Sequence, residues 1–454
     1  MIAWDASHVA GVLGAEQRID GRFESVSTDT RSLKRGALFV ALVGEKFDGH
    51  KFLEEARERG TLGAVVKRGT APVDGLGYFE VNDTLAALGL LACERRREIA
   101  GPVVAVTGSN GKTATKEMLA AALGTKWVVH ATRENLNNLV GVPLTVLDAP
   151  AICDCLVVEV GASEPGEVAR LRRVVEPSIG VVTNVAVAHL EGFGTVERVL
   201  QEKISLLENV QLAVVGTNPP SLAARAAEVA QRVVTAGLGE AARVRPADWG
   251  LDARGRGWLD RGGVRVALPL VGRHQLDNAL LALAVAEELG LDRESVAAAL
   301  GKVRLPPGRC EVLTGGDRTV LHDAYNANPA SLTALLETAR VLRGGRPLVV
   351  VLGTMLELGD NSAKLHAEMA GAVMAAEPDM VAVLGEFVPA FERFARDLGD
   401  RLLTADDPES LGRLVAGRLS GGELVLVKGS HGMRLERAVP YLLLSSETSC
   451  STTS

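Results

Sequence analysis

Apolar runs alternate with amphipathic segments along most of the chain, and this alternation predicts an α/β protein of three domains. In residues 1–100 it predicts strands at Ala37–Val43, Gly63–Lys67 and Gly77–Val81, and helices at Lys51–Arg59 and Leu85–Ile99. A charged run at 94–98 followed by Gly101-Pro102 predicts a boundary. We therefore expect a small N-terminal α/β domain in residues 1–100.

Residues 101–313 contain longer and more apolar runs. These predict strands at Val103–Thr107, Trp127–His130, Leu156–Val160, Ile179–Thr183 and Leu212–Val215. Near-continuous Val, Ile and Leu runs between helical patterns are typical of a mostly parallel sheet that helices cover on both faces. The pattern predicts a central doubly wound domain, with a β-hairpin at Val244–Leu270 and helices at Leu276–Leu289 and Arg293–Val303.

A second boundary is predicted at Pro306-Pro307-Gly308, and the alternation resumes after it. Strands are expected at Val320–His322, Leu348–Leu352, Met380–Leu384 and Leu424–Val427, with helices between them. This order predicts a Rossmann-like C-terminal domain in residues 314–444. Residues 445–454 are almost all small and polar and predict a disordered tail.

The composition narrows the class of protein. The 454 residues carry a net charge of −7 with 4% aromatic side chains and no long basic run, which argues against nucleic acid as a partner. The five cysteines form no C-x-x-C pair, which indicates a reduced cytoplasmic protein without structural zinc. Stable membrane insertion is not expected, because no apolar stretch approaches the length of a membrane span.

The most informative segment is Val103 to Thr113. An apolar strand leads into the turn 108–111, and a helix beginning with Lys112-Thr113 follows. Such a turn directs backbone N–H groups and a helix N-terminus at phosphates, while Lys112 can reach a terminal phosphate and Thr113 can ligate Mg²⁺. The spacing Gly-x-x-Gly-Lys-Thr does not meet the general P-loop pattern in full. The segment still favours binding of a nucleoside triphosphate.

Ionisable side chains follow two further strands of the central domain. Glu159 lies in the run 156–160, and His189 follows the run 179–183. Ligands bind beyond the carboxyl ends of the strands in doubly wound sheets, so both side chains are candidates for a cation site beside the turn. Each also has a purely structural interpretation, and Lys203 in its helix would ordinarily be a solvated surface residue.

Other polar positions carry weaker signals. Asn278 could cap its helix or contact adenine, and Arg309 could reach a phosphate or lie on the surface. The segment 322–329 leaves a strand and enters a helix, which is typical of a ligand loop. In the first domain, 27–31 and 47–50 are dense in hydrogen-bonding groups, for which turn and capping roles suffice.

Taken together, these segments resemble the Mur ligase family, the ATP-dependent amino-acid and peptide ligases of peptidoglycan precursor synthesis, over residues 27–434. The motifs that carry the resemblance are Thr-Gly-Ser-Asn-Gly-Lys-Thr at 107–113, Asn-Leu-Asn-Asn at 135–138 with Gly-Val-Pro at 141–143, His-Leu-Glu-Gly-Phe-Gly at 189–194, Asp-Ala-Tyr-Asn-Ala-Asn-Pro at 323–329, Leu-Gly-Thr-Met-Leu-Glu-Leu-Gly at 352–359, and Lys-Gly-Ser-His-Gly at 428–432. The third and fourth of these motifs are similar to those of the member that joins D-alanyl-D-alanine to UDP-N-acetylmuramoyl-tripeptide. The Asp-Asn-Pro-Arg motif of the relatives that add diaminopimelate or lysine is absent.

The resemblance implies a role for each matching position, with ATP and Mg²⁺ as cofactors. The nucleotide would be contacted by Gly108, Asn110, Gly111, Lys112, Thr113, Asn278, Arg309 and Asp323. The catalytic residues would be Lys112, Glu159, His189 and Lys203, and magnesium would be held by Thr113, Glu159, His189 and, if it is carbamylated, Lys203. The substrates would be contacted by Ser27, Asp29, Arg31, Asp48 and His50 at the uridine end, by Asn135, Asn137 and Asn138 along the peptide, and by Tyr325, Asn326 and Asn328 at the dipeptide.

The implied reaction activates the carboxylate of the tripeptide as an acyl phosphate, which the amine of D-alanyl-D-alanine then attacks. These two substrates are the expected partners, and the chain would act as a cytoplasmic monomer. Two positions depart from the family pattern. Leu139 stands where an acid is common, and Thr354 stands where an aspartate is usual.

Two other functions fit part of the pattern. A folate-polyglutamate-type ligase shares the Gly-Lys-Thr loop and the late helix asparagine, but it needs no uridine-reading domain, whereas about 100 residues precede the loop here. A nucleotide-binding switch would account for the loop alone. The set Glu159, His189 and Lys203 favours catalysis over such a switch.

Overall fold

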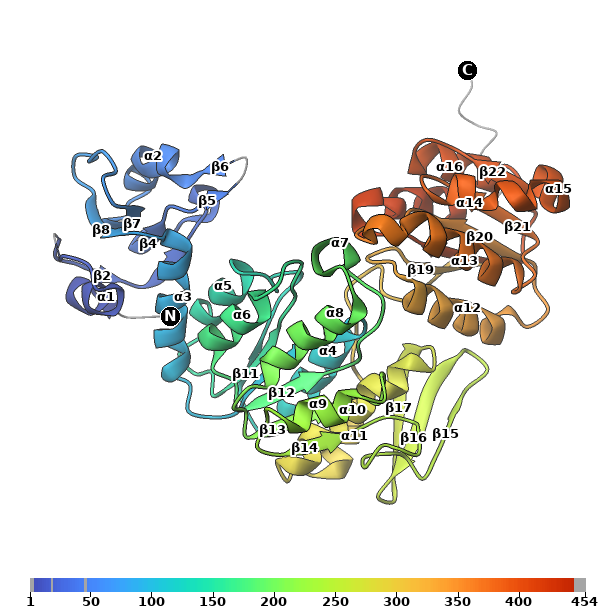
Figure 1. Ribbon diagram of the computed structural model, residues 1–454, viewed down its shortest axis with the longest axis horizontal. Helices are drawn as coiled ribbons and strands as arrows, with labels where there is room; N and C mark the ends of the chain where they lie inside the picture. The colour runs from blue at the N-terminus through green and yellow to red at the C-terminus, as the bar shows by residue number, and fades with distance from the viewer. Residues whose placement is uncertain (1–3, 18, 45–46, 445–454) are drawn as a thin grey trace.

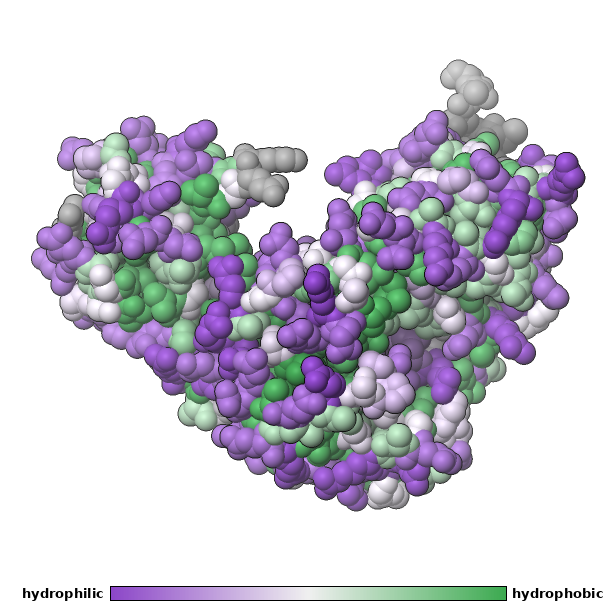
Figure 2. All heavy atoms as spheres, in the orientation of Figure 1, coloured by the Kyte–Doolittle hydropathy of each residue, from purple (hydrophilic) through white to green (hydrophobic). Residues whose placement is uncertain are grey.

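The chain folds into three lobes that follow one another along an arc (Figure 1). The computed structural model describes residues 4–17, 19–44 and 47–444, so the tail predicted at 445–454 lies outside the described residues. The first and third lobes rise from the two ends of the central lobe, and Figure 2 shows a broad hollow between them. Within the described part of the chain, no helix combines the length and the apolar character needed to span a bilayer.

The first lobe is built on a four-stranded parallel sheet. Its strand order is β3 (Ser25–Ser27), β4 (Ala37–Val40), β7 (Gly63–Lys67) and β8 (Gly77–Val81), flanked by α1 (Ala6–Leu13), α2 (Leu53–Glu58) and α3 (Thr84–Arg97). Two short pairs, β1 (Trp4–Asp5) with β2 (Arg22–Phe23) and β5 (Val43–Gly44) with β6 (Phe47–Asp48), complete it. Helix α3 connects this lobe to the next, because Arg95 and Arg96 donate to backbone carbonyls at 149–150 and 175–176.

The central lobe contains a six-stranded, wholly parallel sheet. Its order is β10 (Val129–Ala131), β11 (Cys155–Glu159), β9 (Val103–Thr107), β12 (Ile179–Val182), β13 (Leu212–Val215) and β14 (Val233–Thr235). The chain visits β10 and β11 on one side of β9 and then continues with β12 on the other side. Strand order therefore reverses at β9, and ligands of such sheets bind beyond the carboxyl ends of the strands at that point.

Helices cover both faces of this sheet. On one face α4 (Lys112–Leu123), α10 (His274–Glu288) and α11 (Arg293–Leu300) bury side chains such as Met118 and Leu280 against Val104 and Val106. The opposite side carries α5 (Gly141–Leu147), α6 (Glu167–Val175), α7 (Leu190–Phe193), α8 (Val196–Ile204) and α9 (Leu222–Ala227). Because helices shield both faces of the sheet from water, the strands are apolar along their whole length, and this is the pattern from which they were predicted.

The predicted hairpin at Val244–Leu270 is a three-stranded antiparallel sheet. Its strands are β15 (Asp248–Leu251), β16 (Arg256–Arg261) and β17 (Val264–Val271). Along β17 exposed positions alternate with buried ones such as Val266 and Leu268. One face therefore packs on the central core while the other meets solvent, as antiparallel sheets often do.

The third lobe repeats the parallel plan with one antiparallel edge. Its strand order is β18 (Glu311–Gly315), β19 (Arg318–Asp323), β23 (Leu424–Lys428), β20 (Leu348–Leu352), β21 (Met380–Val383) and β22 (Leu402–Thr404), and only β18 is antiparallel to its neighbour among these strands. Its helices are α12 (Pro329–Arg343), α13 (Ser362–Met374), α14 (Phe387–Phe391), α15 (Ala395–Leu398), α16 (Pro408–Ala416) and α17 (Val439–Leu443). The carboxyl ends of β19 and β23 adjoin, since Asp323 pairs with Lys428 in the register.

Candidate active site

A tight glycine turn connects β9 to α4 at the carboxyl edge of the central sheet. Gly108 has φ +152° and Gly111 has φ +79°, which side-chain-bearing residues rarely adopt. Close packing around the turn also requires glycine at both positions. A Cβ on Gly108 would lie 1.8 Å from Thr183 Oγ1, and one on Gly111 would lie 2.3 Å from Asn278 Oδ1. The predicted phosphate loop thus exists as a turn whose two glycines have no room for a side chain.

The end of β12 holds the middle of this turn rigidly. The backbone N–H of Asn110 donates to Asn184 Oδ1 at 3.1 Å, and its carbonyl accepts from Thr183 Oγ1 at 2.5 Å and from Asn184 Nδ2 at 3.1 Å. Ser109 is fixed as well, because its hydroxyl donates to the carbonyl of Ala186 and accepts from that residue's N–H. The backbone of the turn is therefore held in place before any anion binds.

Lys112 begins α4 and folds back over the turn. Its Nζ donates to the carbonyl of Gly108 at 2.9 Å. Burial lowers the pKa of this ammonium, while the nearby charge of Glu159 raises it. A phosphate at the helix N-terminus would place further negative charge beside this half-buried lysine.

Glu159 joins the turn to a second segment of the central lobe. Its Oε2 accepts from Thr113 Oγ1 at 2.8 Å, and its Oε1 accepts from Asn137 Nδ2 at 2.9 Å. Among the described residues, no group of three or more His, Cys, Asp or Glu side chains converges to hold a metal ion. A divalent cation beside Thr113 and Glu159 would thus need phosphate or water oxygens among its ligands, as Mg²⁺ usually has in proteins.

His189 has a left-handed backbone, with φ +54°, and its side chain reaches the third lobe. The ring Nδ1 is hydrogen-bonded to Glu357 Oε2, and this bond lowers the pKa of the glutamate despite its partial burial. The N–H of Glu191 also donates to the carbonyl of Glu357, at 3.1 Å. Sequence reasoning identified the motif around Glu357 but not this residue as part of the site.

Lys203 lies on α8 with only 2% of its surface exposed, so it is not the solvated residue that a lone helical lysine ordinarily is. Burial, together with the charge of Lys112, lowers its pKa from 10.5 to about 7. An amine with such a pKa is about half neutral near pH 7, and a neutral amine is the form that reacts with carbon dioxide.

Asn278 lies in the second turn of α10, not at the N-cap, where Arg273 stands, so the capping role considered from the sequence is wrong. Its Oδ1 accepts from Thr115 Oγ1 at 3.3 Å, and its Nδ2 donates to Gln275 Oε1 at 3.0 Å. These bonds orient the amide behind the turn. The helix thus lines one end of the cavity described below.

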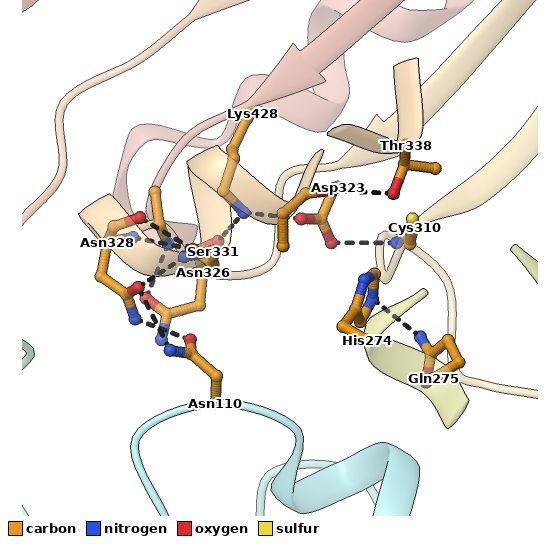
Figure 3. Close-up of polar contacts among 12 residues, drawn as sticks. Asn110, His274, Gln275, Cys310, Asp323, Asn326, Asn328, Ser331, Thr338 and Lys428 are labelled. Carbon is orange, nitrogen blue, oxygen red and sulfur yellow. Dashed lines mark hydrogen bonds and ion pairs between the residues drawn. The ribbon is translucent and has the colours of Figure 1, made fainter. Parts of the chain in front are cut away.

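The third lobe contributes a cluster from the ends of β19 and β23 (Figure 3). Asp323 accepts from the N–H of Cys310 at 2.9 Å through Oδ1 and from Lys428 Nζ at 2.6 Å through Oδ2. Lys428 Nζ also donates to the carbonyl of Asn326 at 2.9 Å. The guanidinium of Arg309 lies 3.8 Å from the centre of the Tyr325 ring. From the sequence, Lys428 is only part of a motif, whereas in the structure it belongs to the site.

These groups surround one cavity of about 450 Å³ between the central and third lobes. It is lined by twelve of the residues singled out from the sequence: Asn110, Gly111, Lys112, Thr113, Asn137, Glu159, His189, Asn278, Arg309, Asp323, Tyr325 and Asn326. It is also lined by polar residues without an assigned role: Ser109, Thr183, Asn184, His274, Gln275, Ser331 and Lys428. Its volume suits a nucleotide-sized ligand.

Other predicted site residues lie outside the cavity lining, namely Gly108, Asn135, Asn138, Lys203 and Asn328. Asn138 precedes α5, and its Oδ1 accepts from the N–H groups of Val140 and Gly141. Asn135 is exposed. Asn328 is 2% exposed and caps α12 through a bond from the N–H of Ser331.

The five candidates of the first lobe form local turns. Asp29 caps a short helix at Thr30–Ser32 and pairs with Arg31, and its N–H donates to Ser27 Oγ at 3.2 Å. Asp48 accepts from both the N–H and the ring Nδ1 of His50, at 3.0 and 2.7 Å. These bonds match the capping roles that the sequence allowed, and they do not bring the five side chains to the cavity.

Comparison with known proteins gives a consistent result. The models of the Mur ligase family catalytic domain, the Mur ligase middle domain and the Mur ligase glutamate ligase domain match residues 22–96, 106–286 and 308–431. A UDP-N-acetylmuramoyl-tripeptide–D-alanyl-D-alanine ligase of Bacillus subtilis is 33% identical over 452 residues, which cover 97% of each chain.

Solved structures agree. A MurF of Acinetobacter baumannii, 28% identical, superposes with a TM-score of 0.88 over 98% of this chain and 99% of its own. A MurF ligase of Thermotoga maritima in complex with ADP, 30% identical, gives 0.82 over 92% and 97%. The chain belongs to the Mur ligase family.

Proposed function

We propose that this chain is an ATP-dependent ligase that joins D-alanyl-D-alanine to UDP-N-acetylmuramoyl-tripeptide and releases ADP and phosphate. The observation that carries the proposal is the convergence of the phosphate turn, Glu159 and the Arg309–Asp323–Lys428 cluster on one cavity between two lobes. The full-length likeness to ligases of this name supports the choice of substrates.

Each step of the reaction has residues suited to it. The turn at 108–111 and Lys112 bind the phosphates of ATP, so that the terminal phosphoryl group can be transferred to the tripeptide carboxylate. The resulting acyl phosphate is a better electrophile than a carboxylate. The dipeptide amine attacks its carbonyl carbon, the amide forms and phosphate leaves. Tyr325 and Asn326 would receive the dipeptide, which their position in the cavity lining of the third lobe supports.

Magnesium is the finer part of the proposal. Thr113, Glu159 and His189 would hold it, with Lys203 if that residue is carbamylated, and it would neutralise charge on the phosphates. The oxygen atoms of Thr113 and Glu159 suit a hard cation, and they are already within hydrogen-bond distance of each other. Lys203 has the depressed pKa that carbamylation needs.

The three lobes would divide the substrate between them. The first lobe, about residues 1–100, would bind the uridine end through Ser27, Asp29, Arg31, Asp48 and His50. Between this lobe and the third lobe lies the hollow of Figure 2, and Asn135, Asn137 and Asn138 would contact the peptide between the uridine end and the cavity. The lobes of residues 101–313 and 314–444 would enclose ATP and close on it. We place this reaction in the cytoplasm and assign it to a monomer.

Phosphate release tests the function. The purified chain with Mg²⁺ and ATP should release phosphate only when both UDP-N-acetylmuramoyl-tripeptide and D-alanyl-D-alanine are present. Replacing the dipeptide by single amino acids should abolish release, which separates this activity from that of a folate-type ligase. Slow ATP hydrolysis at a rate that depends on neither substrate would instead indicate a nucleotide switch. Lys112→Met should abolish phosphate release, whereas the same substitution at an exposed position, Lys302→Met, should leave phosphate release unchanged.

Closure of the central and third lobes on ATP needs a separate test. Small-angle scattering of the chain should change when an ATP analogue and the tripeptide substrate are added together. Identical profiles with and without both ligands would contradict closure, while leaving the proposed reaction intact.

A further inference from the structure

The phosphate turn and the third lobe are joined by a reciprocal amide pair. Asn110 Nδ2 donates to Asn328 Oδ1 at 3.3 Å, and Asn328 Nδ2 donates to Asn110 Oδ1 at 2.7 Å. Figure 3 shows Asn110 rising from the turn to meet Asn328 at the start of α12. The two residues are 218 positions apart in the chain and belong to different lobes.

Both partners are held by their own lobe. The backbone of Asn110 is fixed by three bonds from Thr183 and Asn184 at the end of β12. Asn328 is the N-cap of α12, in a capping box with Ser331, and Pro329 follows it. The backbone of Asn110 and the side chain of Asn328 are fixed by their own lobes, so the pair transmits position between two rigid supports.

Asn328 is buried, and its side-chain amide is engaged in contacts within the protein. Its Oδ1 accepts from Asn110 and from the N–H of Ser331, its Nδ2 donates to Asn110, and only 2% of the residue is exposed. Its neighbour Asn326 is exposed and lines the cavity. The dipeptide role that the family resemblance gives to both asparagines therefore suits Asn326 and not Asn328.

The loop between these supports carries the cavity residues of the third lobe. Lys428 holds its first half by donating to Asp323 and to the carbonyl of Asn326. The pair with Asn110 holds its last residue. The side chains of Tyr325 and Asn326 lie in the loop held by these two sets of contacts. Of the two, only the Asn110–Asn328 pair connects this loop to the phosphate turn.

We infer that Asn328 is a positioning residue, which through Asn110 sets the 323–328 loop against the phosphate turn and thereby places the amine substrate. This inference rests on the proposed function for its substrate. ATP contacts the turn itself, whose backbone is fixed without Asn328. Loss of the pair should therefore affect the dipeptide far more than the nucleotide.

Asn328→Ser is the sharpest variant, because serine is also a good N-cap but its shorter side chain cannot form the amide pair. We expect the KM for D-alanyl-D-alanine to rise by about tenfold or more, as the loss of two neutral hydrogen bonds predicts. The dissociation constant of an ATP analogue should stay within about twofold of wild type. Asp407→Ser, at the N-cap of α16 and likewise followed by proline, is the matched control and should change neither quantity.

A double-mutant cycle distinguishes the pair from two independent roles. Asn110→Ala should raise the KM for the dipeptide as well, and the Asn110→Ala/Asn328→Ser double variant should be no worse in this KM than the more affected single variant. Additive effects on this KM, or an Asn328→Ser enzyme with unchanged KM for the dipeptide, would overturn the inference.

Hydrogen exchange of the ligand-free chain tests the pair without any reaction. In Asn328→Ser and in Asn110→Ala, the amides of 324–328 should exchange faster, whereas those of α16 and those of the turn at 108–111, whose backbone Thr183 and Asn184 hold, should not. Unchanged exchange at 324–328 in Asn110→Ala would refute the link between the lobes. A chain that shows the exchange effect but no ligase activity would refute the proposed function and leave the link standing.

Discussion

Glu357, in the loop after β20, accepts a hydrogen bond from the ring of His189, which follows β12 in the other lobe. Gly359 packs beside the same segment, since a Cβ on it would lie 3.3 Å from the Cα of Glu191. The loop at 352–359 and the segment at 189–194 thus meet face to face. With the Asn110–Asn328 pair, this contact gives the central and third lobes two direct polar bridges beside the cavity.

The first prediction concerns the pH dependence of this bridge. The hydrogen bond from His189 holds the pKa of Glu357 below its ordinary 4.5. A carboxylate with a lowered folded-state pKa stabilises the fold fully above its unfolded pKa, and this contribution is lost as the pH falls below that value. The stability difference between wild type and Glu357→Gln should therefore be constant from about pH 6 down to about pH 5 and then shrink.

Urea unfolding at a series of pH values measures this difference. Glu368→Gln is a suitable control, because Glu368 is exposed and pairs only loosely, at 3.9 Å, with Lys364. The free energy of unfolding of Glu368→Gln should differ little from that of wild type at every pH. A Glu357→Gln difference that grows as the pH falls would contradict the assignment.

The second prediction concerns the glycines of the phosphate turn. Gly111→Ala would place a Cβ 2.3 Å from Asn278 Oδ1, so either the turn or the Asn278 amide must shift, and the amide would then lose its bonds to Thr115 and Gln275. Overpacking of this kind costs about 1–3 kcal/mol, and ATP affinity should fall by about tenfold or more. Gly166→Ala is the matched control, because Gly166 has a similar φ of +88° but no atom within 4 Å of the added Cβ.

Calorimetric titration with an ATP analogue separates steric contact from backbone strain. Gly166→Ala should cost some stability through its left-handed backbone but bind the analogue like wild type. Equal affinities for the Gly111→Ala and wild-type chains would mean that the turn does not bind the phosphates.

The apolar pattern predicted the interior of the fold well. Gly63–Lys67, Gly77–Val81, Leu212–Val215 and Leu348–Leu352 are strands with the predicted bounds. Leu212–Val215 and Leu348–Leu352 are buried along their whole length, and a strand buried on both faces is apolar throughout. The edge strands β14 and β22 are short and contain half-buried or exposed residues, so their pattern does not differ from that of a loop. The same holds for β18, where buried and exposed sides are mixed.

The site was predictable where chemistry follows directly from a strand or a turn. Glu159 and His189 could be placed at the sheet edge because parallel strands end together. Contacts between lobes could not be predicted in this way, because sequence spacing contains no information about which loops meet across an interface. Glu357 as the partner of His189, and Asn328 as the partner of Asn110, are residues of this kind.

The third prediction concerns Lys203. Its pKa of about 7 lies below its ordinary 10.5, so between these values the unfolded chain binds one more proton than the folded chain. Stability must then rise with pH across this window, with a slope that approaches about 1.4 kcal/mol per pH unit. Lys203→Met removes the titrating group and should flatten the rise, leaving the variant more stable than wild type near pH 7.

Chemical denaturation in carbonate-free buffer checks this prediction, because carbamylation would replace the amine by an anion. Adding bicarbonate should then alter the wild type and leave Lys203→Met unchanged. Equal pH slopes for the two chains in carbonate-free buffer would mean that Lys203 is charged and solvated in the folded protein.

The fourth prediction concerns the buried pair of Asp323 and Lys428. Their side chains are 20% and 1% exposed and lie 2.6 Å apart. Removing one member of a buried pair leaves the other charge unpaired, so Lys428→Met should destabilise the fold by about 3 kcal/mol. It should also release the 323–328 loop, because Lys428 holds the carbonyl of Asn326 as well. Ligase activity should therefore fall more than the loss of stability accounts for.

Lys364→Met makes the same chemical change in an exposed pair of the same lobe, with side chains 75% and 57% exposed, and should cost less than about 1 kcal/mol. Urea unfolding compares the two variants directly, and assays well below their midpoints separate activity from unfolding. Asp323→Asn/Lys428→Met, which removes both charges, should recover part of the stability lost in Lys428→Met. If the double variant is less stable than the single one, then the cost lies in lost packing and not in an unpaired carboxylate.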